Sequence, residues 1–223
     1  MANLPVTYDQ YLFLSKTDLD PDTDLLPYTQ QGSPDVGGNT YNLGSPTTGF
    51  TIGYSKSTSN NGMIAVWRYF VTIDTSAINR TPVTAVFNVF ATFDGADIIC
   101  LKSKKVSPTA LEETDWDGHD ETNPIPYTNS ITPDDGGMGT WNSLTFNLDG
   151  KNAMADNDYL EMVCVESDAD YAQVEPAYGT VKSSFYAHGD GGAFEPYLTY
   201  EMGETRTISS GKVNINSGKV TIK

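Results

Sequence analysis

The sequence predicts an all-β protein: an antiparallel β-sandwich of jelly-roll type, followed by a short β-meander tail. Three observations indicate this class. The 223 residues include 13 tyrosines, 20 glycines and 12 prolines, which suits short strands joined by turns. Runs of strand length recur with turn signals between them. These runs do not alternate with helical patterns, which argues against a parallel α/β sheet. We expect one sandwich domain over residues 1–202 and a separate tail over residues 203–223.

The predicted strands are apolar or β-branched runs bounded by Gly, Pro, Asp, Asn or Ser. In chain order they cover residues 8–14, 49–55, 63–73, 83–93, 96–106, 141–148, 159–166, 182–188 and 196–202. Many short strands of this kind favour an antiparallel sandwich, because tight turns can join neighbouring antiparallel strands.

The third run contains "WRYFVTIDTSAI", residues 67–78, and places an arginine among aromatic and β-branched residues. Strand side chains alternate between faces, so one face carries Trp67, Tyr69, Val71 and Ile73 and the other carries Arg68, Phe70 and Thr72. We expect Trp67 in the core. We expect Arg68 on a partly wet face, with its guanidinium beside a carboxylate or carbonyl oxygen. Asp-Thr-Ser at 74–76 ends the strand, because such side chains hydrogen-bond their own backbone in turns.

The next two runs, 83–93 and 96–106, are separated by Asp94-Gly95. Such a pair predicts a β-hairpin with a positive φ in its turn. In the first of these runs, alternation puts Val83, Ala85, Phe87 and Val89 on one face, with Phe87 expected in the core.

A single short helix is predicted over residues 149–158, "DGKNAMADND", with Asp149 as its N-cap. Two cysteines, Cys100 and Cys164, lie in apolar runs. They could pair, but we favour free buried thiols.

Two long loops, 18–62 and 107–140, are rich in Gly, Pro, Asp and Asn, and loops of this length often carry function. The first contains alternate acidic residues that resemble the start of a calcium loop: Asp18, Asp20, Asp22 and Asp24. Thr23 stands where such a loop needs glycine, and Thr29 where it needs a bidentate glutamate. We therefore favour a solvated acidic turn and expect no cofactor, with structural calcium as the weaker alternative.

Catalytic motifs are not evident. The chain has only two histidines, His119 and His188, and no phosphate-binding glycine loop or nucleophile elbow. A pair of glycosidase carboxylates is set by spatial position, so a glycoside hydrolase stays a lesser alternative. An aromatic platform for a sugar could come from Trp116 or Trp141. Trp116 lies in the second long loop, where a simple loop anchor is the alternative, and Trp141 starts a predicted strand, where a structural role is the alternative.

The net charge of −16 argues against nucleic acid as a partner, because phosphates would be repelled. The N-terminal stretch "MANLPVTYDQYLFL" lacks the basic and apolar regions of a signal peptide, and no run is long enough to cross a bilayer. We therefore expect synthesis in a cytoplasm, without export by the ordinary route and without a membrane partner.

Several stretches, in order, resemble the DNRLRE-type jelly-roll domain, a relative of carbohydrate-binding modules found in bacterial surface proteins and phage virion proteins. "RYFVTIDTSAI" is similar to its R-x-F-x-x-F-D-T-S-x-I strand, and "PVTAVFNVFAT" to the strand that follows. Residues 140–170 resemble its W-x-x-F-T-L-N-x-D-G segment, and residues 175–202 its closing F-Y-S-S-E and P-x-L-x-V-x-Y strands. The resemblance spans roughly residues 8–202. Ile73 and His188 depart from the family pattern.

The resemblance implies a jelly roll used for binding and assembly. The expected function is a non-enzymatic phage virion protein, a capsid decoration or external appendage component assembled in the host cytoplasm. Its expected partners are other virion proteins, further copies of itself and surface glycans. The alternative is a carbohydrate-binding module of a surface protein.

The tail "TRTISSGKVNINSGKVTIK" repeats Ser-Gly-Lys-Val at an offset of seven residues. With turns at Ser210-Gly211 and Ser217-Gly218, Ile215 opposes Val220 and Val213 opposes Ile222. The predicted product is a three-stranded meander whose apolar face carries Ile208, Val213, Ile215, Val220 and Ile222. A sheet this small is not stable alone in water, so we expect this face to dock on another surface. We favour a subunit of the same assembly, and the protein's own sandwich is the alternative.

Overall fold

The chain forms an antiparallel β-sandwich, as the sequence predicts. The computed structural model describes residues 1–16, 39–44, 49–57, 64–104, 119–120, 123–134, 136–137, 139–172, 174, 178–187, 193–203, 213–216 and 219–222. Its strands are β1 (Ala2–Pro5), β2 (Tyr8–Lys16), β3 (Asn39–Gly44), β4 (Phe50–Lys56), β5 (Ile64–Asp74), β6 (Thr84–Phe93), β7 (Ile98–Lys102), β8 (Thr140–Thr145), β9 (Tyr159–Glu166), β10 (Gly179–Phe185), β11 (Tyr197–Glu201), β12 (Val213–Asn216) and β13 (Lys219–Ile222). The helical elements are α2 (Leu148–Asp156) and the π-helical turn η2 (Ser167–Tyr171). β1 and β3 are the strands of the sandwich that the sequence reasoning missed.

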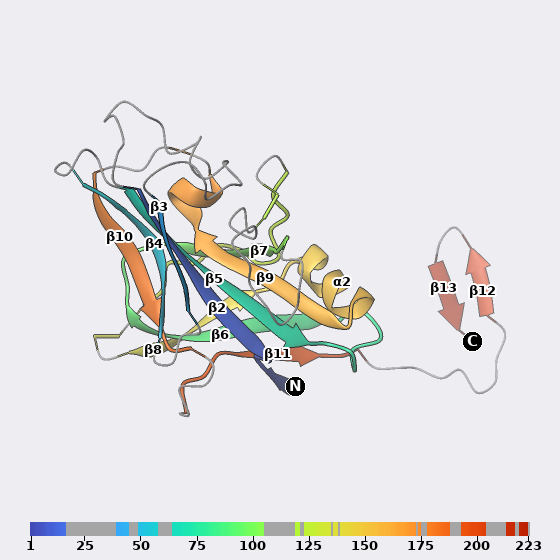
Figure 1. Ribbon diagram of the computed structural model, residues 1–223. Coiled ribbons are helices and arrows are strands. Elements are labelled where there is room, and N and C mark those ends of the chain that lie inside the picture. Colours follow the sequence, from blue (N-terminus) through green and yellow to red (C-terminus); the bar gives the residue numbers. More distant parts are fainter. Residues whose placement is uncertain are drawn as a thin grey trace.

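The strands of the sandwich form one continuous sheet that folds over on itself. Its order is β1-β11-β6-β10-β4-β5-β2-β3, with β8 beside β6 and with β9 between β5 and β7. β10 connects the two halves, because it pairs with β4 along its whole length and with β6 only at Ser184 and Phe185. Figure 1 shows β2, β5 and β9 crossing in front of β6. The core lies between these two halves.

Each half contributes every second side chain to this core, as expected of strands. Ala85, Phe87 and Val89 of β6 face Tyr69, Val71 and Ile73 of β5 in one cluster of buried residues. The expected core position of Phe87 is confirmed, because its side chain is fully buried. Val83 was wrongly placed on that face. It precedes the first residue of β6 and is 58% exposed.

Trp67 is also not where the sequence reasoning put it. It is partly exposed and lies outside the buried core cluster, although it alternates correctly with the core residue Tyr69. Trp67 stands near the beginning of β5, where its ring lines a surface depression together with Phe50 and Thr51.

The predicted hairpin at Asp94-Gly95 is wrong. β6 and β7 do not pair with each other, because β7 pairs with β9 in the opposite half of the sandwich. The connection is a corner between the halves, and Ser183 of β10 holds it by accepting the N–H groups of Gly95 and Ala96 at 3.1 and 3.0 Å. Position 95 requires glycine because the backbone of β10 passes close to it: a Cβ there would lie 2.6 Å from the carbonyl oxygen of Lys182. Gly95 does not have a positive φ.

The predicted helix is present as α2, but its N-cap is Asn147 and not Asp149. The Asn147 side chain accepts the N–H of Gly150 at 3.0 Å and donates to the Pro126 carbonyl oxygen at 2.6 Å. This second bond ties the start of the helix to a neighbouring segment. Asp149 instead lies in the first turn, where a negative charge suits the helix dipole. No helix in the part of the chain described above is long and apolar enough to cross a membrane.

β12 and β13 form a two-stranded sheet of their own, which stands apart from the sandwich in Figure 1. The predicted register of this hairpin is confirmed: Val213 pairs with Ile222 and Ile215 with Val220. The third strand predicted for the tail, with Ile208, lies outside the described residues.

Candidate functional site

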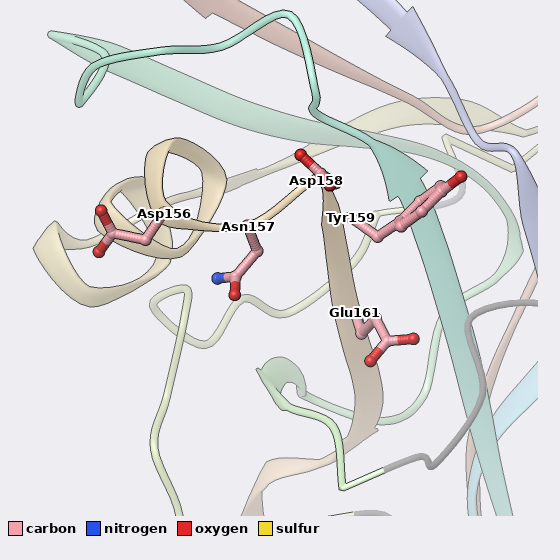
Figure 2. Close-up of a pocket in the computed structure, with 5 residues that line it drawn as sticks. All are labelled: Asp156, Asn157, Asp158, Tyr159 and Glu161. Carbon is pink, nitrogen blue, oxygen red and sulfur yellow. The ribbon is translucent and has the colours of Figure 1, made fainter.

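A surface depression of about 410 Å³ lies where α2 gives way to β9 (Figure 2). Its lining residues are Asp156, Asn157, Asp158, Tyr159 and Glu161. The turn that carries them is fixed to the corner after β5. Thr75 donates its N–H to the Asp158 carbonyl oxygen at 2.8 Å and its hydroxyl to the Asn157 carbonyl oxygen at 2.9 Å.

Three acidic side chains lie beside this depression. Figure 2 shows those of Asp156, Asp158 and Glu161 pointing in different directions. Glycoside hydrolysis needs two carboxyl groups that face one bond from roughly 5–10 Å apart. Within the described ranges, no group of three or more His, Cys, Asp or Glu side chains is arranged to hold a metal ion. These observations single out neither a catalytic pair nor a metal site among the residues that line the depression.

Arg68 on β5 forms an ion pair in the protein interior. It has no exposed surface, and its Nε and one terminal nitrogen donate to the two carboxylate oxygens of Asp170 at 2.9 and 2.6 Å. The carboxylate partner expected from the sequence is therefore present. The expected partly wet face is wrong, because Phe70 and Thr72 on the same face are buried as well. The sequence does not reveal that η2 folds over this face and brings Asp170 to Arg68.

Glu166 holds η2 in the position that this ion pair needs. Its carboxylate caps the turn by accepting the backbone N–H groups of Asp168, Ala169 and Asp170 at 2.8, 2.6 and 3.2 Å. Burial raises the pKa of Glu166, while the three N–H donors act in the opposite direction. One buried carboxylate thus orders the π-helical turn, and a second neutralises Arg68. We assign both a structural role.

His119 is a further buried ionisable group near Arg68 and Asp170. Its side chain is 1% exposed, and neither ring nitrogen has a hydrogen-bond partner in the structure as described. Burial, followed by repulsion from Arg68, lowers the pKa of His119 from 6.5 to about 4, against opposing attraction from Asp170. The imidazole is therefore neutral at pH 7. His188, the other histidine, lies outside the described residues.

Cys100 and Cys164 face each other directly across β7 and β9. Both are buried, and the structure has no disulfide between them, although their Sγ atoms are only 2.7 Å apart. The free thiols favoured from the sequence stay a prediction. Burial, with a further contribution from Cys100, raises the pKa of the Cys164 thiol. A thiol of this kind is a poor nucleophile at neutral pH.

Trp141, a sugar-platform candidate from the sequence, is the second residue of β8 and is 38% exposed. Its ring lies edge-on to two others. The centroid distances are 5.5 Å to Phe90 of β6 and 5.1 Å to Tyr197 of β11. Trp141 thus both packs against its neighbours and presents part of its ring to solvent. The packing contacts fit the structural interpretation of this residue, and the binding interpretation stays a prediction.

The other candidates from the sequence fall into two groups. Trp116 and the acidic residues Asp18, Asp20, Asp22 and Asp24 lie outside the described residues. The tail residues Val213, Ile215, Val220 and Ile222 belong to the β12–β13 hairpin, at paired positions that share one face of this small sheet.

Sequence reasoning missed the residues that gather around Trp141. Phe90 and Tyr197 were counted only as members of predicted strands. A usable signal was present: Phe90 belongs to the even-numbered face of β6, opposite the predicted core residues. A large aromatic residue on the face turned away from the core predicts a contact with something else.

Comparison with known proteins adds no assignment. A scan against models of protein families found no match to this chain, and a search among curated proteins found no similar one.

Proposed function

We propose that this chain is a non-enzymatic structural protein of a phage virion, a capsid decoration or external appendage component whose C-terminal hairpin docks on another copy of the chain. The observation that carries the proposal is the separate β12–β13 sheet. An isolated two-stranded hairpin is at best marginally stable in water. Pairing in register puts four β-branched apolar residues on one face of the hairpin. Covering this face with another surface would therefore stabilise the hairpin.

The charge distribution favours a second copy as the docking surface. Residues 1–202 contain nine basic and 28 acidic residues, a net charge of −19, whereas residues 203–223 contain four basic residues and one acidic residue, a net charge of +3. A positive tail is attracted to the acidic sandwich of a neighbour, and such attraction guides association. Repetition of this contact between copies builds an assembly.

The sequence supports the virion context. The ordered resemblance of residues 8–202 to the DNRLRE-type domain suggests a jelly roll of the kind that phage virion proteins use. The strongly negative sandwich suits a protein that must remain soluble until it assembles. In this proposal the tail links the copies of the chain to one another, and the sandwich forms part of the outer surface of the virion.

The proposal is tested by the mass of the protein in solution, measured by light scattering after size exclusion. We expect the full chain to form a defined oligomer, and a chain ending at residue 202 to be a folded monomer. Two neighbouring cross-strand pairs of the hairpin provide a matched comparison. Ile215→Asp with Val220→Asp should abolish the oligomer, because both charges enter the apolar face. Asn214→Asp with Thr221→Asp, on the opposite face, should preserve it.

A tail-deleted chain with the same mass distribution as the full chain would contradict the docking role. Equal effects of the two double variants would show that general charge, and not the apolar face, controls the association.

Carbohydrate binding is the second candidate function. The observation that favours it is the partial exposure of Trp141 within a group of aromatic rings. The two functions are compatible, because a virion surface protein can also bind glycans on its host. A glycoside hydrolase remains the third and weakest candidate.

A further inference from the structure

The outer face of β8, β6 and β11 carries a group of aromatic side chains, some of them exposed. Alternate side chains of these strands point away from the core. In register they form rows across the sheet: Trp141 is beside Phe90, and Ser143 is beside Asn88, which in turn is beside Tyr197. The strands concerned lie side by side in the lower part of Figure 1. The rows from Trp141 to Tyr197 therefore carry aromatic and uncharged polar residues, and Val86 and Glu201 lie further along the same face.

Five aromatic rings form one continuous group on this face. Phe90 is at its centre and contacts Trp141, Tyr186 and Phe194, with ring centroids 5.5, 5.7 and 4.2 Å away. Tyr197 extends the group beyond Trp141. Phe90 is 9% exposed, whereas Trp141 is 38% and Phe194 40% exposed. A buried ring thus supports exposed ones, which fixes their orientation at little cost in side-chain entropy.

Local backbone geometry adapts to this aromatic group. Gly139, two residues before Trp141, has a φ of +98°, which L side chains rarely adopt. A Cβ at this position would also lie 2.4 Å from the ring of Phe90. The residue just before β8 must therefore be glycine, both because of its positive φ and because the ring of Phe90 leaves no space for a side chain.

A chain of polar side chains runs beside the rings across four strands. The Ser143 hydroxyl donates to Asn88 Oδ1 at 2.9 Å, and Asn88 Nδ2 donates to the Thr199 hydroxyl at 3.0 Å. Thr199 in turn donates to Asn3 Oδ1 at 3.3 Å. All four side chains are uncharged. Ser143 and Asn3 at the two ends are exposed, so their remaining donor and acceptor capacity faces solvent.

Resting on the carbohydrate-binding function named above as the second candidate, we propose that this aromatic and amide face is a binding site for an uncharged oligosaccharide, with Trp141 and Tyr197 stacking on pyranose rings and Ser143 and Asn3 hydrogen-bonding to sugar hydroxyls. A pyranose ring has an apolar side of polarised C–H groups, which suits the negative face of an aromatic ring. Its edge carries hydroxyl groups, which suit side chains able both to donate and to accept. The row of rings next to a row of hydroxyl and amide groups matches these two sides of a sugar.

The negative charge of the protein disfavours anionic glycans and leaves uncharged ones as ligands. A net charge of −16 repels anionic saccharides, and the polar row contains no basic residue that would compensate. A peptide that adds as a strand is less suitable, because strand addition uses the backbone groups of a free sheet edge, whereas this surface is a face formed by side chains. An uncharged glycan is therefore the occupant to which the chemistry points.

The test uses the full-length protein and immobilised oligosaccharides. Neutral hexasaccharides of glucose, mannose, galactose and xylose are compared with oligogalacturonate, followed by calorimetric titration of any positive probe. We expect binding to at least one neutral probe and none to oligogalacturonate. Trp141→Ala should weaken binding by about tenfold or more, as expected when a stacking ring is lost. Tyr197→Ala should act in the same direction.

Tyr178→Ala is the matched control, because Tyr178 is 54% exposed and has no part in the aromatic group. It should bind within about twofold of the unchanged protein, a difference below ~0.5 kcal/mol. Equal thermal midpoints of the Trp141 and Tyr178 variants would exclude misfolding as the cause. If Trp141→Ala unfolds the chain, Ser143→Ala is used instead and should reduce affinity without loss of structure.

The proposal is overturned if the protein binds no neutral probe at millimolar concentrations, if only the anionic probe binds, or if Trp141→Ala and Tyr178→Ala bind equally well. It is also overturned if Trp141→Ala changes the oligomeric mass without any glycan binding, because a second copy would then cover this face. Failure of the virion proposal would leave these measurements unaffected, since they need only the isolated protein.

Discussion

Replacement of His119 should change how the stability of the protein depends on pH. In the folded chain this buried imidazole has a pKa of about 4, compared with 6.5 when it is free. The unfolded state therefore takes up the proton first as the pH falls. The stabilising effect of a neutral buried histidine is complete above pH 6.5 and is lost as the pH approaches 4.

The size of this effect follows from the shift. A difference of one pKa unit corresponds to about 1.4 kcal/mol, so the full shift contributes about 3 kcal/mol. Urea unfolding is measured for the unchanged protein and for His119→Leu at intervals from pH 7.5 to pH 4. The difference between their free energies of unfolding should move in favour of the leucine variant by about this amount. Carboxylates that titrate in the same range cancel in the difference.

A constant difference across this pH range would refute the reasoning. It would mean that His119 reaches water, or a partner, in its protonated form. The groups that surround it are Arg68, Lys104, Asp170 and Asp120, and the first two oppose protonation.

Three further predictions concern the interior. Phe87→Ala should lower the free energy of unfolding by ~3–5 kcal/mol in urea titrations, because a fully buried ring leaves a cavity, and a small effect would contradict the core assignment. Arg68→Met should cost ~3–5 kcal/mol by leaving Asp170 charged and buried, and Arg68→Met with Asp170→Leu should recover most of this loss. The thiols of Cys100 and Cys164 should react with a thiol-specific dye only after unfolding, whereas rapid reaction in the native protein would show that the β7–β9 pair opens.

The sequence was sufficient for those features that depend on local periodicity. The strands β5, β6, β9 and β11 were predicted from runs of apolar residues, and the β12–β13 register followed from a repeat with one turn at Ser217-Gly218. Both are short-range properties of the chain.

Features that depend on distant segments were not predictable. Asp94-Gly95 has the composition of a hairpin turn, but the strands on its two sides pair in opposite halves of the sandwich, β6 with β8, β10 and β11 and β7 with β9. Likewise, Arg68 has its carboxylate 102 residues away in η2, an element with no signal in the sequence. Alternation within β5 predicts two faces, but not that η2 covers the second.

The same limit applies to the candidate site. Trp141 was identified as an exposed aromatic residue with a structural alternative, but its neighbours Phe90, Tyr186, Phe194 and Tyr197 come from four other segments of the chain. The register of β6 with β8 and β11 brings Phe90, Trp141 and Tyr197 together, and the connection from β10 to β11 adds Tyr186 and Phe194.

The proposed virion function is tested most directly by quantitative mass spectrometry of purified phage particles. After gradient purification and washing at high salt, peptides of this chain should be present in amounts comparable to those of other structural subunits. A phage encoding the chain without residues 203–223 should give particles that lack it. Absence of the chain from intact particles, or equal incorporation of the truncated chain, would contradict the account.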